Sequence, residues 1–301
     1  MSNIGLLLIC LLSGYILRKT RILSQEGPKA LNQLIIYFFI PILTLHHVPK
    51  LVFQWEFLWL SLSPFLIYLG SYLYFQFVKR VKRLDRPTEG ALIMSSGIGS
   101  ISFVGFPIFD LLYGSEGLAY GILLSLAGTL IVFNTLGLAT GLYYSGKSKS
   151  PSSFLRRLFS FPPLVAFLLA LTMNITGFQF PAYFQILLEK LTEPFSVLAL
   201  LAIGSQIDLS LEKELIHFML IGQLYKLVLA PLLMYALIWQ IFGVQNVLGK
   251  VCILGAAIGS MNAVSILAAQ LNLRPRLAIL MPSLSIPISI LSLFFIDYLL
   301  G

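Results

Sequence analysis

The feature that most constrains the fold is a series of long apolar segments separated by short polar loops. Of the 301 residues, 58% are hydrophobic and only 11% are charged, whereas soluble domains carry roughly a quarter charged residues. An apolar helix of about 20 residues is long enough to cross the hydrocarbon core of a bilayer. We therefore predict an all-α polytopic membrane protein. Its ten predicted transmembrane helices are residues 3–17, 30–48, 56–78, 89–112, 117–144, 159–177, 182–206, 214–242, 248–271 and 276–300.

The fourth predicted span carries residues that weaken a helix in its middle. It contains the stretch SSGIGSISFVGFPIFDLLY at 95–113, in which glycines and serines are interspersed ahead of Pro107. Glycine loosens a helix, and proline removes a backbone donor. Backbone groups freed within a membrane need protein or water around them. We predict that this span breaks between Ser102 and Pro107, inside a protein-lined cavity that forms the binding site.

The ninth predicted span echoes the fourth in the stretch GAAIGSMNAVSILAAQ at 255–270. The tripeptide Ile-Gly-Ser at 98–100 recurs at 258–260, and Val104 recurs as Val264, so both matches have an offset of 160 residues. Paired interrupted spans at corresponding positions of two halves are typical of secondary transporters. We therefore predict that spans four and nine are broken crossover helices.

The placement of basic residues predicts the orientation in the membrane. Lys and Arg fall in the loops after spans one, three, five, seven and nine, apart from Lys50, Lys190, Lys226 and Lys250. Cytoplasmic loops are enriched in Lys and Arg, so we expect an integral plasma (inner) membrane protein with both termini on the non-cytoplasmic side. Five spans per half make the second half enter from the opposite face. The predicted domains are a first five-helix repeat (1–144), a cytoplasmic linker loop (145–158) and a second, inverted five-helix repeat (159–301).

Four stretches of the chain carry a family resemblance: residues 14–43, VGFPIFDLLYGSEGL at 104–118, PFSVLALLAIGSQIDLS at 194–210 and LYKLVLAPLL at 224–233. They resemble the auxin efflux carrier family of bacterial and plant transporters, which belongs with the inverted-repeat carriers of the bile acid and arsenite type. The resemblance implies a transport domain that contains crossing helices four and nine and moves against a scaffold. It also implies carriage of a small organic anion, such as a mono- or dicarboxylate. The chain departs from the family at Ser100, where Asn is usual, and at Asn262, where Pro often follows Met.

The candidate substrate-binding residues are small or polar side chains near the two interruptions. A broken helix end offers free amide groups and the positive end of the helix dipole, which can bind a carboxylate without an arginine. Serines and glycines also let helices pack closely, and that alternative stays open, as does a simple kink at the proline. The candidates are Ser100, Ser102, Gly105, Pro107, Ser260, Met261, Asn262 and Ser265.

Three further polar side chains are candidates for charge balance or coupling. Lys226 lies well inside a span, where it would either reach toward the interface or neutralise the substrate or Asp208. Asp110 would carry a proton or cap a carbonyl cluster, or it would lie solvated near the membrane interface. Gln206 would cap its helix or line an inner vestibule.

Together these patterns predict a secondary-active or facilitative transporter, an auxin efflux carrier-like permease that works by alternating access. We predict that it is not an enzyme, because the chain has only 3 His and lacks the His-Glu-x-x-His and Gly-x-Ser-x-Gly motifs. Cys10 and Cys252 both lie in apolar spans and indicate neither a disulfide nor a metal site. The alternatives are a passive channel or a transport-inactive membrane sensor on the same scaffold.

The expected partners are a small organic anion and the lipid bilayer, with no nucleic acid. We expect no cofactor, while coupling to sodium or protons is left open. The sequence also leaves open a homodimer, the identity of the anion, the direction of transport and the effect of Ser100 in place of the family asparagine.

Overall fold

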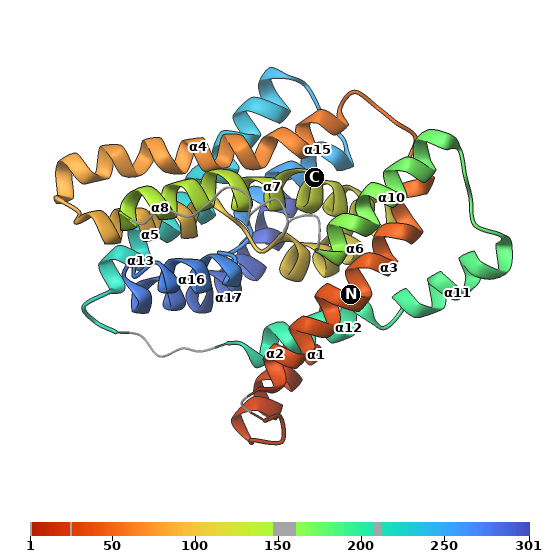
Figure 1. Cartoon of the computed structure of the whole chain (residues 1–301), viewed down its shortest axis with the longest axis horizontal. Helices are drawn as coiled ribbons and strands as arrows, with labels where there is room; N and C mark the ends of the chain where they lie inside the picture. The colour runs from red at the N-terminus through yellow and green to blue at the C-terminus, as the bar shows by residue number, and fades with distance from the viewer. Residues whose placement is uncertain (1, 25, 147–160, 208–211) are drawn as a thin grey trace. The chain divides into compact units, whose positions relative to one another are not determined.

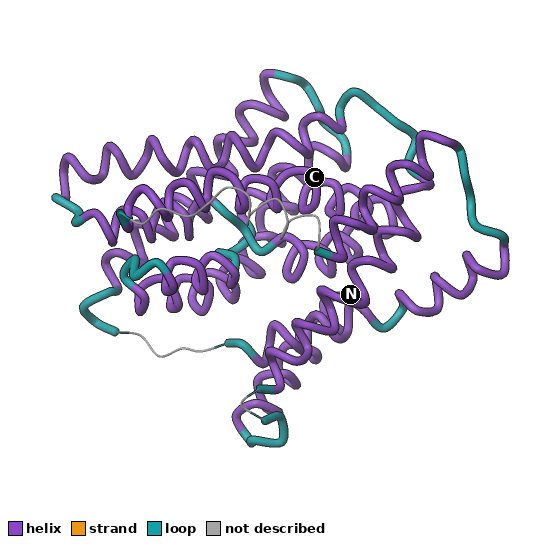
Figure 2. The backbone as a smooth tube through the Cα atoms, in the orientation of Figure 1, coloured by secondary structure: helices purple, strands orange, loops and turns teal. Residues whose placement is uncertain are grey.

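The computed structural model describes residues 2–24, 26–146, 161–207 and 212–301. This part of the chain consists of helices and their connecting loops (Figure 2), which confirms the all-α prediction. An antiparallel bridge between Gly99 and Ser260 is the one isolated β-pairing within the described ranges. Most of the predicted linker at 145–158, and Asp208, lie outside the described residues. Five helices are long and apolar enough to cross a membrane: Gly27–Lys50, Phe57–Lys82, Ile101–Ser145, Ile216–Ile241 and Pro275–Leu300.

The chain folds into two compact units, and each unit draws segments from both halves of the sequence. The first comprises Met1–Gln54, Ser102–Leu126 and Pro151–Ile207, and the second comprises Trp55–Ile101, Ala127–Ser150 and Asp208–Gly301. These units are defined by spatial contact. The predicted repeats, 1–144 and 159–301, divide the sequence differently from these units, and they stay a prediction.

In the first unit, α1 packs on α12 and α10 packs on α3 (Figure 1). Its core contains Phe195, whose ring centroid lies 6.1 Å from that of Phe39 and 6.3 Å from that of Phe106. The helices of this unit are α1 (Ser2–Lys19), α2 (Gly27–Leu34), η1 (Ile35–Phe39), α3 (Ile40–His47), η2 (Val48–Lys50), α6 (Phe106–Leu123), α10 (Pro162–Thr176), α11 (Ala182–Thr192) and α12 (Phe195–Ser205).

The α1–α12 pair depends on two glycines that allow the backbones to touch. A Cβ atom on Gly14 would clash with the carbonyl of Leu201, and one on Gly204 would clash with the carbonyl of Leu11. Small residues at such positions are the usual means by which membrane helices approach closely. The absence of a side chain at each glycine therefore lets Gly14 lie against Leu201 and Gly204 lie against Leu11.

In the second unit, α4, α5 and α8 pack side by side, and α15 contacts α4, α14 and α17 (Figure 1). Its buried core includes Ile98, Val264, Met281 and Tyr68. Two helices, η3 (Ile101–Gly105) and η4 (Leu124–Thr129), run across the boundary between the units. The other helices are α4 (Phe57–Lys82), α5 (Arg86–Gly97), α7 (Leu130–Val132), η5 (Phe133–Gly137), α8 (Leu138–Ser145), α13 (Ile216–Leu224), η6 (Tyr225–Leu229), α14 (Ala230–Met234), η7 (Tyr235–Ile241), α15 (Val247–Ala257), α16 (Asn262–Gln270) and α17 (Pro275–Leu300).

The offset of 160 residues seen in the sequence reappears in the positions of the helix ends. α5 ends at Gly97, and α15 ends 160 positions later, at Ala257. A positive φ occurs at Gly114 (φ 62°, ψ −152°) and again at Arg274 (φ 44°, ψ 64°), also 160 positions apart, although the two ψ angles differ. These correspondences favour an internal repeat, although the inverted ten-helix arrangement itself stays a prediction.

We predict that replacing Gly14 or Gly204 by alanine lowers the thermal unfolding midpoint of the purified protein. Each new methyl group would force the α1 and α12 backbones apart, and overpacking of this kind costs about 1–3 kcal/mol. Gly5→Ala is the control. Gly5 also lies on α1, and a Cβ atom there would have no neighbour within 4 Å among the described residues. Equal midpoints for all three variants would show that the close approach does not stabilise the fold.

Candidate functional site

The first interruption lies earlier in the chain than the sequence analysis predicted. α5 ends at Gly97, Ile98 is extended (φ −123°, ψ 117°), and the helix resumes at Ile101. The predicted break between Ser102 and Pro107 is therefore wrong in position. Gly105 has helical backbone angles (φ −69°, ψ −49°), and Pro107 follows it in the helical run that resumes at Ile101.

The second interruption lies where the sequence places it. α15 ends at Ala257, and the backbone is extended at Ile258 (φ −68°, ψ 135°) and at Met261 (φ −79°, ψ 128°). α16 then begins at Asn262. Spans four and nine are thus both broken, which confirms the prediction of two interrupted helices.

The two interrupted segments hydrogen-bond to each other, and we call residues 98–100 and 258–261 the crossing. The amide of Ser100 donates to the carbonyl of Gly259 at 2.8 Å, and the amide of Met261 donates to the carbonyl of Ile98 at 3.1 Å. The pairing at Gly99 and Ser260 is antiparallel, so the segments run in opposite directions. Backbone groups buried away from water need partners. Each break therefore supplies the partners that the other requires.

The crossing packs closely against two other helices of the second unit. The amide of Ser260 donates to the hydroxyl of Ser285 on α17 at 2.8 Å. A Cβ atom on Gly259 would lie 2.7 Å from the backbone of Ser285 and Ile286. On the opposite segment, a Cβ atom on Gly99 would lie 3.1 Å from the Nζ atom of Lys226. Both glycines keep room for a neighbour, and one of these neighbours is a buried ammonium group.

Several polar side chains at and near the crossing are buried without a hydrogen-bond partner in the described part of the chain. Buried polar groups are almost always paired, so each exception needs an explanation. Some of these atoms belong to predicted site residues, and others belong to α5 and α13. They are the hydroxyl oxygens of Ser95, Ser96, Ser100, Ser260 and Ser265 and the Oε1 atom of Gln223.

The structure brings together one group of the predicted site residues in the second unit. Ser100, Ser260 and Met261 lie in the crossing itself, and Asn262 and Ser265 follow in α16. Met261 packs against the hydrophobic core of the unit. Lys226 on η6 is 1% exposed, and its ammonium group lies beside Gly99.

The other predicted residues lie in the first unit and have partners there. The Ser102 and Ser125 hydroxyls are 2.6 Å apart, and Asp110 accepts a hydrogen bond from Ser196 at 2.9 Å. Gly105 and Pro107 belong to the continuous helix described above. Asp110 is half-buried, so it is a bonded side chain of this unit and not a fully solvated one.

Gln206 ends α12, where its side chain has two partners. Its Nε2 atom donates to the carbonyl of Ala202 at 2.9 Å and to Asn32 at 3.1 Å, and Asn32 donates back at 3.2 Å. Of the two roles considered for Gln206, the structure favours the helix cap.

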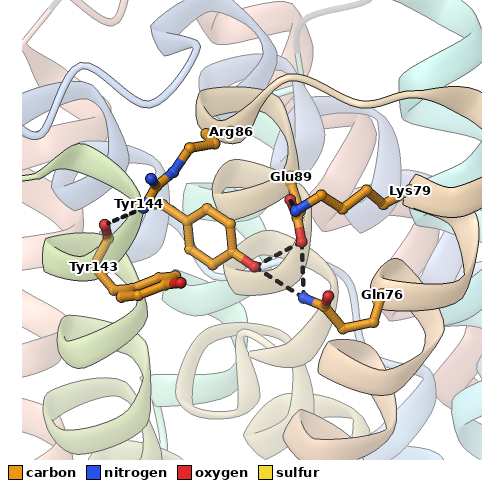
Figure 3. A network of polar contacts seen from close by, with 6 residues as sticks. All are labelled: Gln76, Lys79, Arg86, Glu89, Tyr143 and Tyr144. Carbon is orange, nitrogen blue, oxygen red and sulfur yellow. Dashed lines mark hydrogen bonds and ion pairs between the residues drawn. The ribbon is translucent and has the colours of Figure 1, made fainter.

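Sequence reasoning missed Glu89, a buried carboxylate in the first turn of α5 (Figure 3). It is 0% exposed, and its Oε2 atom lies 2.7 Å from the Nζ atom of Lys79. Its Oε1 atom accepts hydrogen bonds from Gln76 at 2.8 Å and from Tyr144 at 2.7 Å. The network joins α4, α5 and α8. Glu89 stands at the start of a predicted span, and an acidic residue in that position is a signal that could have identified it.

Comparison with known proteins gives a consistent assignment. A model of a family described as membrane transport protein matches residues 1–150. An uncharacterized transporter of Methanocaldococcus jannaschii is 27% identical over 240 residues, which are 77% of this chain and 76% of that protein. An uncharacterized transporter of Methanothermobacter thermautotrophicus is 29% identical over 180 residues, or 56% of each chain.

This chain belongs to the auxin efflux carrier family of membrane transport proteins. The resemblance based on four sequence stretches is confirmed, and two of these stretches, 14–43 and 104–118, fall inside the matched region. As a member of the auxin efflux carrier family with several membrane-length apolar helices, the protein is an integral, multi-pass membrane protein.

We predict that Gly259→Ala destabilises this auxin efflux carrier family protein more than Gly99→Ala does. The first methyl group would meet rigid backbone of α17, whereas the second would meet the flexible end of Lys226 at 3.1 Å and the Ile258 carbonyl at 3.2 Å. We expect a loss of about 1–3 kcal/mol for Gly259→Ala and a smaller loss for Gly99→Ala, measured as thermal midpoints in detergent. The reverse order would contradict the described packing of the crossing.

We also predict that Glu89→Ala lowers the thermal midpoint more than Lys79→Ala does. Removing Glu89 leaves Gln76 and Tyr144 without their buried acceptor, at a cost of about 1–3 kcal/mol. Lys79 is 42% exposed, so water replaces part of its contribution. The double variant Glu89→Ala/Lys79→Ala completes a cycle, and a coupling energy of zero would show that the two charges do not interact.

Proposed function

We propose that the protein is a secondary-active or facilitative transporter, an auxin efflux carrier-like permease that moves a small organic anion across the membrane. The anion is a carboxylate, and it binds at the crossing. The observation that carries this proposal is the pair of interrupted helices joined by backbone hydrogen bonds, with a buried ammonium group beside them.

The electrostatics of the crossing favour an anion. α16 begins at Asn262, directly after the paired segment, so its first free amide groups and the positive end of its dipole lie there. The side-chain nitrogen of Lys226 lies beside Gly99, and a bound carboxylate would favour its protonated, positively charged form. The unpaired hydroxyl groups of Ser100 and Ser260 can each donate a hydrogen bond to a carboxylate oxygen.

The proposed mechanism is alternating access within two inverted five-helix repeats. The matching helix ends at Gly97 and Ala257 and the antiparallel pairing of the two breaks support such repeats. The unit that holds the crossing would serve as the mobile transport domain, and the other unit as the scaffold. We place the protein in the plasma (inner) membrane with both termini outside the cytoplasm, as the distribution of Lys and Arg favours.

Transport of labelled mono- and dicarboxylates into proteoliposomes tests this function. We expect saturable uptake that is stimulated by unlabelled anion on the opposite side. Ser260→Ala removes a buried donor to a charged ligand, an effect of about 1.5–3 kcal/mol, so the concentration for half-maximal uptake should rise roughly tenfold to a hundredfold. Ser283→Ala, on α17, is the matched control.

Three outcomes would contradict the proposal. Unitary currents in planar bilayers would indicate a channel. Anion binding without uptake by folded protein would indicate a sensor. Unchanged kinetics in Ser260→Ala would move the site away from the crossing.

A further inference from the structure

Lys226 is a fully buried lysine with no counter-ion among the described residues. Within the described residues, none of the ion pairs includes it. The helix that carries it is held in place, because the hydroxyl of the neighbouring Tyr225 donates to the carbonyl of Ile67 on α4. The absence of a side chain at Gly99 leaves the space that the Nζ atom occupies. The side chain therefore lies at the crossing without an ion-pair partner in the part of the chain that the structure describes.

Among the described Lys, Arg, Asp and Glu residues of this unit, Glu89 is the other fully buried one, and it already has a partner of opposite charge. Lys79 lies 2.7 Å from one oxygen, while Gln76 and Tyr144 donate to the other. Glu89 also lies eight residues before Gly97, or about 12 Å along the axis of α5. Among the described residues, a protonated Lys226 would therefore be the one fully buried charge near the crossing without a partner of opposite sign.

Several oxygen atoms of the crossing, α13 and α16 have no hydrogen-bond partner among the described residues and could bind the rest of a ligand. The hydroxyls of Ser100, Ser260 and Ser265 can donate hydrogen bonds to an oxyanion, and Gln223, one helical turn before Lys226, offers a free acceptor. Uncharged donors can bind a carboxylate that one ammonium group has neutralised. A second carboxylate would have only these uncharged donors and the partial positive charge at the start of α16, and a buried charge without a full counter-charge is unfavourable.

We propose that Lys226 makes the crossing selective for small monocarboxylates over dicarboxylates, an inference that rests on the function proposed above. One carboxylate and one ammonium group form an electroneutral buried pair. A dicarboxylate would leave one negative charge without a partner. Lys226 is therefore the residue that determines the charge of the substrate.

Binding of three probes of equal length tests this proposal: butyrate, succinate and the neutral butyramide. Affinities are measured by calorimetry and by thermal stabilisation of the purified full-length chain in detergent. Wild-type protein should bind butyrate at least tenfold more tightly than succinate and should bind butyramide weakly. Lys226→Gln should lose at least tenfold in butyrate affinity and should reverse the order of butyrate and butyramide. Lys82→Gln, which removes an exposed cation at the end of α4, should leave all three affinities unchanged.

Several results would overturn the inference. Equal or tighter binding of succinate by the wild type would do so without any variant, so the test stands even if Lys226→Gln fails to fold. Unchanged butyrate affinity in folded Lys226→Gln would also overturn it. Saturable transport of dicarboxylates that does not depend on Lys226 would overturn the charge selectivity and leave the transport function standing. Absence of both binding and transport for every probe would overturn both.

Discussion

The structure depends on the hydrogen bonds that join two broken helices within the second unit. A helix interrupted at membrane depth exposes amide and carbonyl groups that lipid cannot satisfy. Here the amides of Ser100 and Met261 reach carbonyls of the opposite segment, so the two breaks satisfy each other. Neither interruption would be stable alone, because its freed groups would lack partners. The crossing is thus a single cooperative feature built from two distant parts of the chain.

Once the crossing exists, its packing determines which groups surround it. Gly259 lets α17 approach until backbone meets backbone, and Gly99 leaves room for the head of Lys226. The result is an interior that contains serine hydroxyls and an ammonium group where an ordinary membrane helix bundle would hold apolar side chains. Unpaired buried polar groups of this kind reduce stability, and a ligand that pairs with them would recover that loss. The groups that reduce the stability of the protein when unpaired are thus the same groups that would bind the proposed anion.

The two fully buried residues among the described Lys, Arg, Asp and Glu residues of the second unit differ in their partners. Glu89 lies near the start of α5, where the partly exposed Lys79 can reach it from α4, and it joins three helices into a rigid end. Lys226 lies at the level of the crossing, where no carboxylate of the described residues pairs with it. The difference follows from position, because Lys79 near the end of α4 can reach Glu89, whereas Lys226 lies at the level of the crossing.

The sequence alone determined that the chain is helical, that it enters the membrane repeatedly, and that spans four and nine are weakened in the middle. Hydropathy and glycine content are local properties, so they are readable without a fold. Tertiary structure decided where the first break lies. The amide of Ser100 bonds to the carbonyl of Gly259, a contact between distant residues that a local signal such as Pro107 cannot reveal. It also separated the candidates, since Asp110 and Gln206 pair with side chains of the first unit while Ser100, Ser260 and Lys226 gather in the second. Glu89 was missed for the same reason: the pattern of a single span cannot reveal a partner on another helix.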